Sequence, residues 1–157
     1  MLGVFTNSKH HFGLPERSSS FLLSETGDGD SPYRLYAIDV FPHLEWNSQG
    51  LYSGIPYITG HTATHDGSLL WVNAAETWVD IIGYQFSQNS EGRVINFISE
   101  SGVLELFLFA SAVKDSPKRV AQKLATISGY QSMPPFYALG FHYSKWDRQT
   151  SANEVMT

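Results

Sequence analysis

The sequence predicts a mainly β protein folded as a β-sandwich. Short runs of β-branched and aromatic residues are separated by turn residues about every eight to twelve positions, a spacing typical of all-β sandwiches. Hydrophobic residues make up 42% of the 157 residues and aromatic residues 14%, whereas only 16% are charged. A chain of this length and composition can bury a hydrophobic core.

The strands are predicted mainly in the middle of the chain. The N-terminal part is rich in Ser, Gly, Pro and Asp and indicates loops, with one short strand near 21–24. The last apolar run, VLELFLFA, is apolar on both faces except at Glu105, so we expect both of its faces to be covered. The predicted strands are 33–40, 56–61, 68–75, 77–82, 84–88, 93–100 and 103–110.

One helix is predicted over 117–127. Ser116 is placed to cap it, a proline occupies its first position, and Gly129 follows its end. After a proline-rich connector, an aromatic run predicts a strand at 137–143, and SANE at 151–154 has the pattern of a capping box. Because a strand followed by a helix start is typical of an α/β unit, we expect this chain to be the N-terminal piece of a larger protein.

Composition argues against several classes of function. The net charge is −5 and there is no long basic block, so we expect no nucleic-acid partner. The absence of cysteine excludes disulfides and thiol chemistry. The longest apolar run, 103–113, contains an acidic residue and is too short to span a membrane. The opening MLGVFTNSK becomes polar at once and does not predict a secretory signal.

The local motifs alone do not define a reaction. His61 and His65 have the spacing of two zinc ligands on a helix, but their region predicts strand and loop, and we expect no metal there. Glu76 and Asp80 would share one face of a strand about 13 Å apart, too far for the carboxylate pair of a retaining glycosidase. The two histidines at 10–11 are expected in an exposed loop. These observations indicate a β-rich domain that could bind carbohydrate.

Several longer motifs, taken together and in order, resemble glycoside hydrolase family 31. They extend over about residues 10–150 and include HHFGLPE, PYRLYAIDVF, LYSGIPYITGH, LLWVNAAETWVDI, ISESGVLELFLF and YQSMPPFYALGFHYSKW. The resemblance implies an N-terminal β-sandwich followed by a (β/α)8 barrel. Residues 1–115 would then be a partial sandwich domain, 116–136 a linker helix and connector, and 137–157 the start of a truncated barrel.

The resemblance also implies a chemistry, the retaining hydrolysis of terminal α-linked glucose. Such enzymes use two carboxylates about 5 Å apart, one as nucleophile and one as acid/base. In the family both belong to later barrel loops, which would lie beyond Thr157. We therefore assign no catalytic residue to this chain and expect the chain alone to be inactive. The family needs no metal and no organic cofactor.

Three residues match positions that bind substrate in the family. Asp39 would hydrogen-bond sugar hydroxyls and Phe41 would wall the pocket, while Trp146, just after the first barrel strand, would line it. Alternatively, Asp39 caps a strand end and Trp146 packs under the barrel rim. The order Ser53–Gly54 is reversed relative to close family members, and Asp147–Arg148 replaces the usual Asn and aromatic residue, so fine substrate preference stays open.

The resemblance is greatest to the family members that trim glucose from N-linked glycans. It implies an endoplasmic reticulum lumen location for the parent protein, an α-glucoside or N-glycan substrate, and a heterodimer with a beta subunit. It implies no membrane partner. Two alternatives stay open at this point, a non-catalytic carbohydrate-binding sandwich and a structural remnant without function.

Overall fold

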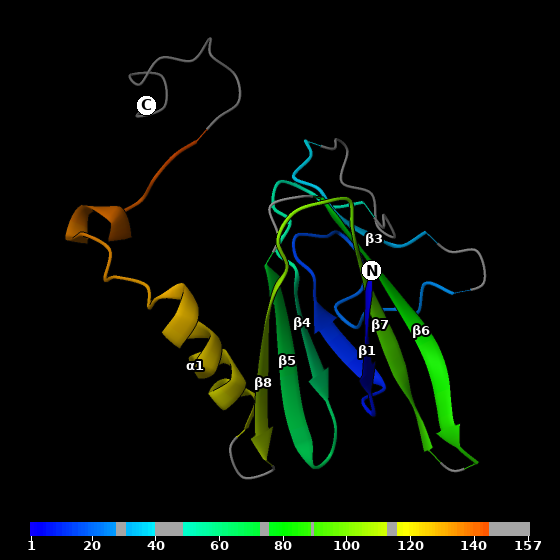
Figure 1. The fold of residues 1–157 in the computed structure, drawn as a ribbon. Helices are drawn as coiled ribbons and strands as arrows, with labels where there is room; N and C mark the ends of the chain where they lie inside the picture. The colour runs from blue at the N-terminus through cyan, green and yellow to red at the C-terminus, as the bar shows by residue number, and fades with distance from the viewer. Residues whose placement is uncertain (28–30, 40–48, 73–75, 89, 113–115, 145–157) are drawn as a thin grey trace.

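The computed structural model of the chain forms two four-stranded antiparallel sheets that face each other (Figure 1). It describes residues 1–27, 31–39, 49–72, 76–88, 90–112 and 116–144. In spatial order, the first sheet consists of β1 (Leu2–Thr6), β7 (Ser90–Ser99), β6 (Thr77–Ser87) and β3 (Tyr33–Leu35). The second consists of β2 (His10–Gly13), β4 (Tyr57–His61), β5 (His65–Val72) and β8 (Glu105–Ala112).

One hydrophobic cluster joins the two sheets. Alternate residues point inward in the first half of β6 and around Phe97 of β7, so that Val79, Ile81 and Phe97 are almost completely buried. Ile58 of β4 and Leu69 of β5 approach the same cluster from the second sheet. The predicted β-sandwich is therefore confirmed, with its core between the sheets.

The hairpin of β6 and β7 is longer than the sequence suggests. The runs at 77–82 and 84–88 were expected as two strands, because Gly83 lies between them, but they form the single strand β6. The backbone amide of Gly83 donates to Glu25 Oε2 at 3.0 Å, and a Cβ at this position would lie 2.7 Å from the same oxygen. Gly83 therefore makes room for a carboxylate rather than ending the strand.

The predicted helix is present as α1 (Ser116–Ser128), packed on β8 and β5 (Figure 1). Its Val120 is 1% exposed, and Lys123 Nζ donates to the carbonyl oxygen of Ala110. Gly129 follows with a φ of +89°, the left-handed conformation that ends many helices. Among the described residues, no helix is long and apolar enough to cross a membrane.

Two N-terminal strands, β1 and β2, were not predicted from the sequence. Residues 10–13 were expected in a loop, but they form β2 and pair with β4 in the register His10↔His61. Conversely, residues 21–24 are not a strand, and the strand expected at 33–40 is limited to β3. The error has a physical cause, because pairing with a distant strand stabilises a segment whose own residues favour a turn.

The strand β8 is covered on one face only. It was expected to be buried on both faces, but Leu108 is 67% exposed on the face opposite Phe109, which is 9% exposed. Residues 69 and 108 are paired, so Leu108 faces the same way as the core residue Leu69. The interior of the sandwich is thus open to solvent beside β8.

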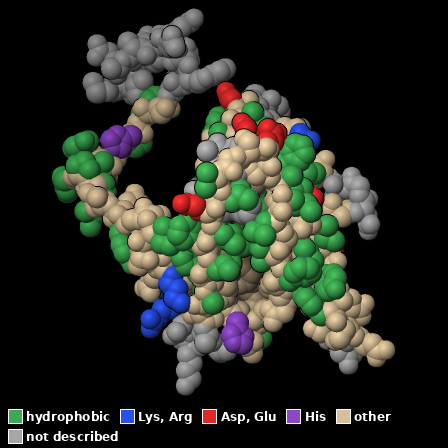
Figure 2. Space-filling view, in the orientation of Figure 1, with side chains coloured by type: hydrophobic (Ala, Val, Ile, Leu, Met, Phe, Trp, Pro, Cys, Tyr) green, Lys and Arg blue, Asp and Glu red, His purple; other side chains and the backbone are tan. Residues whose placement is uncertain are grey.

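The segment after α1 extends away from the sandwich (Figures 1 and 2). A barrel strand was expected at 137–143, but residues Phe136–Leu139 form a 3-10 helix and residues 140–144 are not a strand. Phe136 and Phe141 are each 90% exposed. A strand requires a neighbouring strand for its backbone hydrogen bonds, and none of the described residues pairs with this segment.

Candidate functional site

Asp39 lies at the end of an extended segment that follows β3. This segment is joined to residues 50–55 by the bond from the Ile38 amide to the Leu51 carbonyl oxygen, 2.7 Å long. Residues 50–55 are joined in turn to residues 14–17, since the Leu51 amide donates to the Glu16 carbonyl oxygen at 3.0 Å. Three backbone segments therefore lie side by side and hold Asp39 at the surface.

Two glycines allow this close packing. A Cβ on Gly50 would lie 2.6 Å from the carbonyl oxygen of Tyr36, and one on Gly54 would lie 2.7 Å from that of Leu35. Both distances are shorter than a van der Waals contact, so any larger residue would push the segments apart. The order Ser53–Gly54 places the glycine at the tight position.

Arg17 ties the same segments to β3. Its Nε donates to the Leu14 carbonyl oxygen at 2.7 Å and its Nη2 to the Arg34 carbonyl oxygen at 2.9 Å. The guanidinium also lies 4.8 Å from the centre of the Tyr33 ring, a cation–π distance. Burial lowers the pKa of Arg17 to about 10, so it stays charged near neutral pH.

Asp39 and Tyr52 form a hydrogen-bonded pair at the surface. The Tyr52 hydroxyl donates to the Asp39 carboxylate, and this bond, together with the negative charge of Asp39, raises the pKa of Tyr52. Tyr52 is 58% exposed, and Asp39 is exposed as well. A carboxylate has about four acceptor positions, so Asp39 can accept further hydrogen bonds from hydroxyl groups in solution. The exposed ring of Tyr52 offers an apolar face beside it.

Of the three predicted binding residues, Asp39 alone lies in the part of the chain that the structure describes. Phe41 and Trp146 lie outside the described residues. Sequence reasoning missed Tyr52, although it belongs to the quoted motif LYSGIPYITGH. The signal that could have found it is its place directly before the Ser53–Gly54 pair, whose glycine packs against the strand leading to Asp39.

The other polar residues weighed from the sequence form no such surface site. His61 Nδ1 pairs with Asp66 Oδ1, and no group of three potential metal ligands occurs within the described ranges. Asp80 accepts a bond of 3.1 Å from Thr26 Oγ1, and Glu76 is exposed. The expectation that His11 is exposed is wrong, because it is 2% exposed and lies in β2 between the sheets.

Residues 4–80 match a protein-family model described as the glycosyl hydrolase 31 N-terminal galactose mutarotase-like domain. This match spans the scaffold of Asp39 and Tyr52. Residues 4–80 belong to glycosyl hydrolase family 31. The family 31 resemblance and the β-sandwich class predicted from the sequence are both confirmed.

The sequence relatives of this chain are named as α-glucosidases or as a glucosidase subunit. Neutral alpha-glucosidase AB of Sus scrofa is 33% identical over 159 residues, which cover 92% of this chain and 16% of that protein. Glucosidase 2 subunit alpha of Saccharomyces cerevisiae is 36% identical over 143 residues, which cover 91% of this chain and 14% of that protein. The chain therefore spans about one sixth of the length of the curated relatives it matches.

A solved structure agrees with these relatives. The crystal structure of the glucosidase II alpha subunit in a Glc1Man2-bound form matches with a TM-score of 0.67 and 33% sequence identity. The match covers 78% of this chain and 14% of that one. The named relatives and this solved structure thus agree with the family match of residues 4–80.

Proposed function

We propose that the protein is a retaining α-glucosidase and that this chain supplies one wall of its glucose-binding pocket. The observation that carries the proposal is the exposed Asp39–Tyr52 pair on a rigid scaffold. The likeness to neutral alpha-glucosidase AB and to the glucosidase II alpha subunit supports it. Phe41 is proposed as an apolar wall after Asp39, and Trp146 as a residue at the rim of the barrel.

The role of this chain is to orient the sugar rather than to cleave it. Asp39 accepts hydrogen bonds from two hydroxyls of a glucose ring, while the Tyr52 hydroxyl fixes the rotamer of its carboxylate. Rigid orientation of a substrate lowers the entropy cost of reaching the transition state. The nucleophile and the acid/base, two carboxylates about 5 Å apart in retaining enzymes, are assigned to the barrel and not to this chain.

The proposed substrate is a terminal α-linked glucose on an N-glycan, trimmed in the lumen of the endoplasmic reticulum. The glucosidase II alpha subunit whose structure resembles this chain was crystallised in a Glc1Man2-bound form, which supports a glucosylated mannose glycan. The yeast relative is named a subunit, which supports a heterodimer with a beta subunit. The hydrolysis uses water and carboxylates and requires no cofactor.

An immunodepletion experiment tests the proposal. An antibody raised against residues 1–157 should remove the activity on a chromogenic α-glucoside from an extract of the source cells, and the captured protein should carry that activity. A control antibody of the same class should leave the activity in the extract. Capture of the native protein in good yield without any α-glucosidase activity would overturn the proposal.

A binding experiment on the isolated chain distinguishes this proposal from a second candidate function, a non-catalytic carbohydrate-binding module. The second candidate is favoured by one observation, that Asp39 and Tyr52 are exposed and already paired in the chain by itself. Titration of the chain with glucose or nigerose, followed by the NMR signals of Tyr52, measures binding without the barrel. The enzyme proposal expects neither hydrolysis nor saturable binding at Asp39, whereas the module requires such binding.

A further inference from the structure

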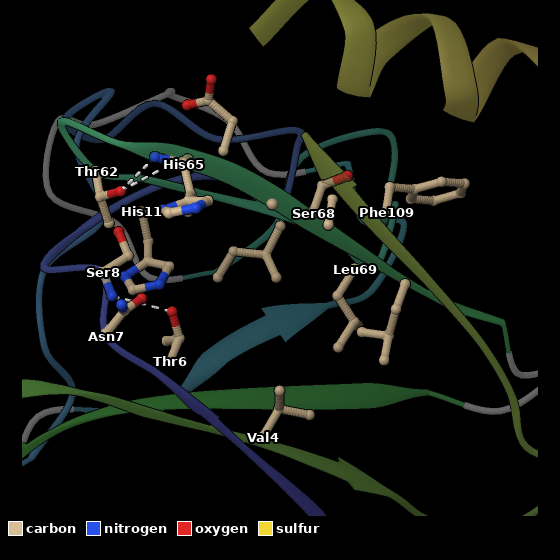
Figure 3. A pocket seen from close by; sticks show the side chains of 16 residues that line it. Val4, Thr6, Asn7, Ser8, His11, Thr62, His65, Ser68, Leu69 and Phe109 are labelled. Carbon is tan, nitrogen blue, oxygen red and sulfur yellow. Dashed lines mark hydrogen bonds between the residues drawn. The ribbon is translucent and has the colours of Figure 1, made fainter. Parts of the chain in front are cut away.

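A pocket lies inside the sandwich, at the end opposite to Asp39. Its volume is about 370 Å³, and it is situated between β1 of the first sheet and β4, β5 and β8 of the second (Figure 3). Asp39 follows β3, which pairs with the beginning of β6. The pocket lies near Thr6, which is aligned through Arg93 of β7 with Gly83, a residue farther along β6. The two sites are therefore independent of each other.

The pocket is polar at one end and apolar at the other. Ser8, His11 and His65 gather at the polar end, and Val4 and Leu69 lie across from them (Figure 3). Leu108 completes the apolar side and is 67% exposed, so the pocket is accessible beside β8. A ligand in this pocket would meet hydrogen-bonding groups on one side and a hydrophobic surface on the other.

His11 is the group in the pocket that indicates a ligand. It is 2% exposed, and its Nε2 atom has no hydrogen-bond partner among the described residues. Buried polar atoms are nearly always paired in native proteins, because an unpaired one costs about 1–3 kcal/mol. Burial, together with the charge of Arg93, lowers the pKa of His11 to about 4, so that its ring is neutral at pH 7.

Gly60 lies close beside this nitrogen. It pairs with His11 across β2 and β4, and a Cβ there would lie 3.2 Å from His11 Nε2 and 3.1 Å from Ser8 Cβ. Ser8 Oγ already donates to the carbonyl oxygens of His10 and His61, at 2.8 and 2.7 Å. The hydroxyl hydrogen of Ser8 is thus engaged and is not donated to His11 Nε2.

We propose that this pocket binds a neutral, hydroxyl-bearing ring molecule, such as a monosaccharide or a cyclic polyol. One hydroxyl bonds to His11 Nε2, and the C–H face of the ring lies on Val4, Leu69 and Leu108. A hydroxyl suits this nitrogen because it can both donate and accept, whichever tautomer the neutral imidazole adopts. An anion would lose its hydration against the apolar side and would find no positive charge on the neutral ring of His11.

The size of the pocket limits the ligand. Small-molecule sites in proteins usually measure about 300–1,000 Å³, so a pocket of about 370 Å³ accommodates one ring rather than an oligosaccharide. This site is therefore distinct in kind from a glycan-binding surface. It goes beyond the α-glucosidase proposal and does not depend on it.

The test is an NMR titration of the whole chain with methyl β-D-glucopyranoside and, separately, with myo-inositol. We expect saturable shifts in the His11 ring signals and in the methyl groups of Leu69 and Leu108 for at least one probe. The substitution Gly60→Ala should abolish these shifts because its Cβ would lie 3.2 Å from Nε2 and crowd the hydroxyl bound there. The substitution Asp39→Asn, at the other end of the sandwich, should leave them unchanged.

A second variant keeps the test decisive if Gly60→Ala does not fold. Leu108→Trp adds bulk at an exposed position of the pocket and should weaken binding at least tenfold without disturbing the fold. The proposal is overturned if neither probe shifts the His11 signals at its highest soluble concentration, or if the shifts persist in a folded blocking variant. A third outcome would also contradict the proposal. If the ligand shifts the signals of both His11 and Tyr52 in the parent chain, and Asp39→Asn abolishes both sets of shifts, the ligand binds at the Asp39 site.

Discussion

The hydroxyl of Tyr52 donates a hydrogen bond to the carboxylate of Asp39, and the two residues come from separate backbone segments that glycines bring into contact. The family resemblance implies a sugar-binding carboxylate at Asp39, and the structure adds Tyr52 as a hydrogen-bond partner of that carboxylate. A carboxylate with a fixed partner loses less side-chain freedom when it binds a substrate. This is the physical basis on which the pair is proposed to orient a sugar.

The first prediction concerns the phenol of Tyr52. Because the pKa of Tyr52 is raised by the hydrogen bond to Asp39 and by its negative charge, Asp39→Asn should lower that pKa toward about 10. The measurement is a pH titration of the tyrosine ring carbons by NMR in the isolated chain. Glu76→Gln, which removes an exposed carboxylate elsewhere, is the matched control and should leave the Tyr52 titration unchanged. An unaltered pKa in Asp39→Asn would contradict the pairing.

The second prediction concerns the proposed enzyme. A chimera in which this chain replaces the matching segment of yeast glucosidase 2 subunit alpha should hydrolyse α-glucosides, since the two segments are 36% identical. In that chimera, Asp39→Asn should lower kcat/KM about 10- to 100-fold, the effect of losing hydrogen bonds to a charged group. Tyr52→Phe should lower it about 3- to 10-fold, because only the positioning of Asp39 is lost.

Glu76→Gln again serves as the control in the chimera and should keep kcat/KM within about twofold of the parent. Steady-state kinetics on a chromogenic α-glucoside give all three values. Should Asp39→Asn behave like Glu76→Gln in a folded, active chimera, the substrate-binding role of Asp39 would be refuted.

The third prediction tests the scaffold under the pair. Gly54→Ala forces a Cβ to within 2.7 Å of the Leu35 carbonyl oxygen, so we expect the free energy of unfolding to fall by about 1–3 kcal/mol. Gly27→Ala is the matched control, because a Cβ there meets no atom within 4 Å, and it should change stability little. Urea unfolding of both variants measures the difference. Equal stabilities would show that residues 50–55 do not pack as tightly as described.

Local signals predicted part of this fold correctly and long-range pairing decided the rest. The helix α1 carried its own start, apolar face and stop, and Val120 on that face is 1% exposed. The strands β4, β6 and β7 were predicted from β-branched and aromatic runs. The strand β2 was missed because HHFG has no such run, and its strand conformation depends on pairing with β4, far along the chain.

The candidate site shows the same limit. Asp39 was named as a site residue through the family resemblance of the motif around it, and its role in binding stays a prediction. Tyr52 was missed because its contact with Asp39 depends on the close packing at Gly50 and Gly54, and its place directly before Ser53–Gly54 is the local sign of that packing. His11 was expected to be exposed for a related reason, because its burial follows from the register of β2 against β4.

The last prediction is a pH dependence of stability that originates from His11. The pKa of His11 is about 4 in the folded chain, whereas the ordinary value of 6.5 applies to the unfolded chain. Between pH 6.5 and pH 4 the unfolded chain therefore binds a proton that the folded chain does not. The free energy of unfolding should therefore decrease as the pH falls from 6.5 to about 4, by about 3 kcal/mol from this group, and no further below that.

Carboxylates titrate near the lower end of the same range, so the contribution of His11 has to be isolated by substitution. In His11→Gln, the decrease in the free energy of unfolding between pH 7 and pH 4.5 should be clearly smaller than in the parent chain. His142→Gln removes an exposed histidine of the segment after α1 and should keep the decrease of the parent. Urea unfolding at a series of pH values measures all three chains. If the two variants lose stability in parallel, His11 is not held neutral by burial, and the chemical argument for a neutral ligand beside Nε2 fails with it.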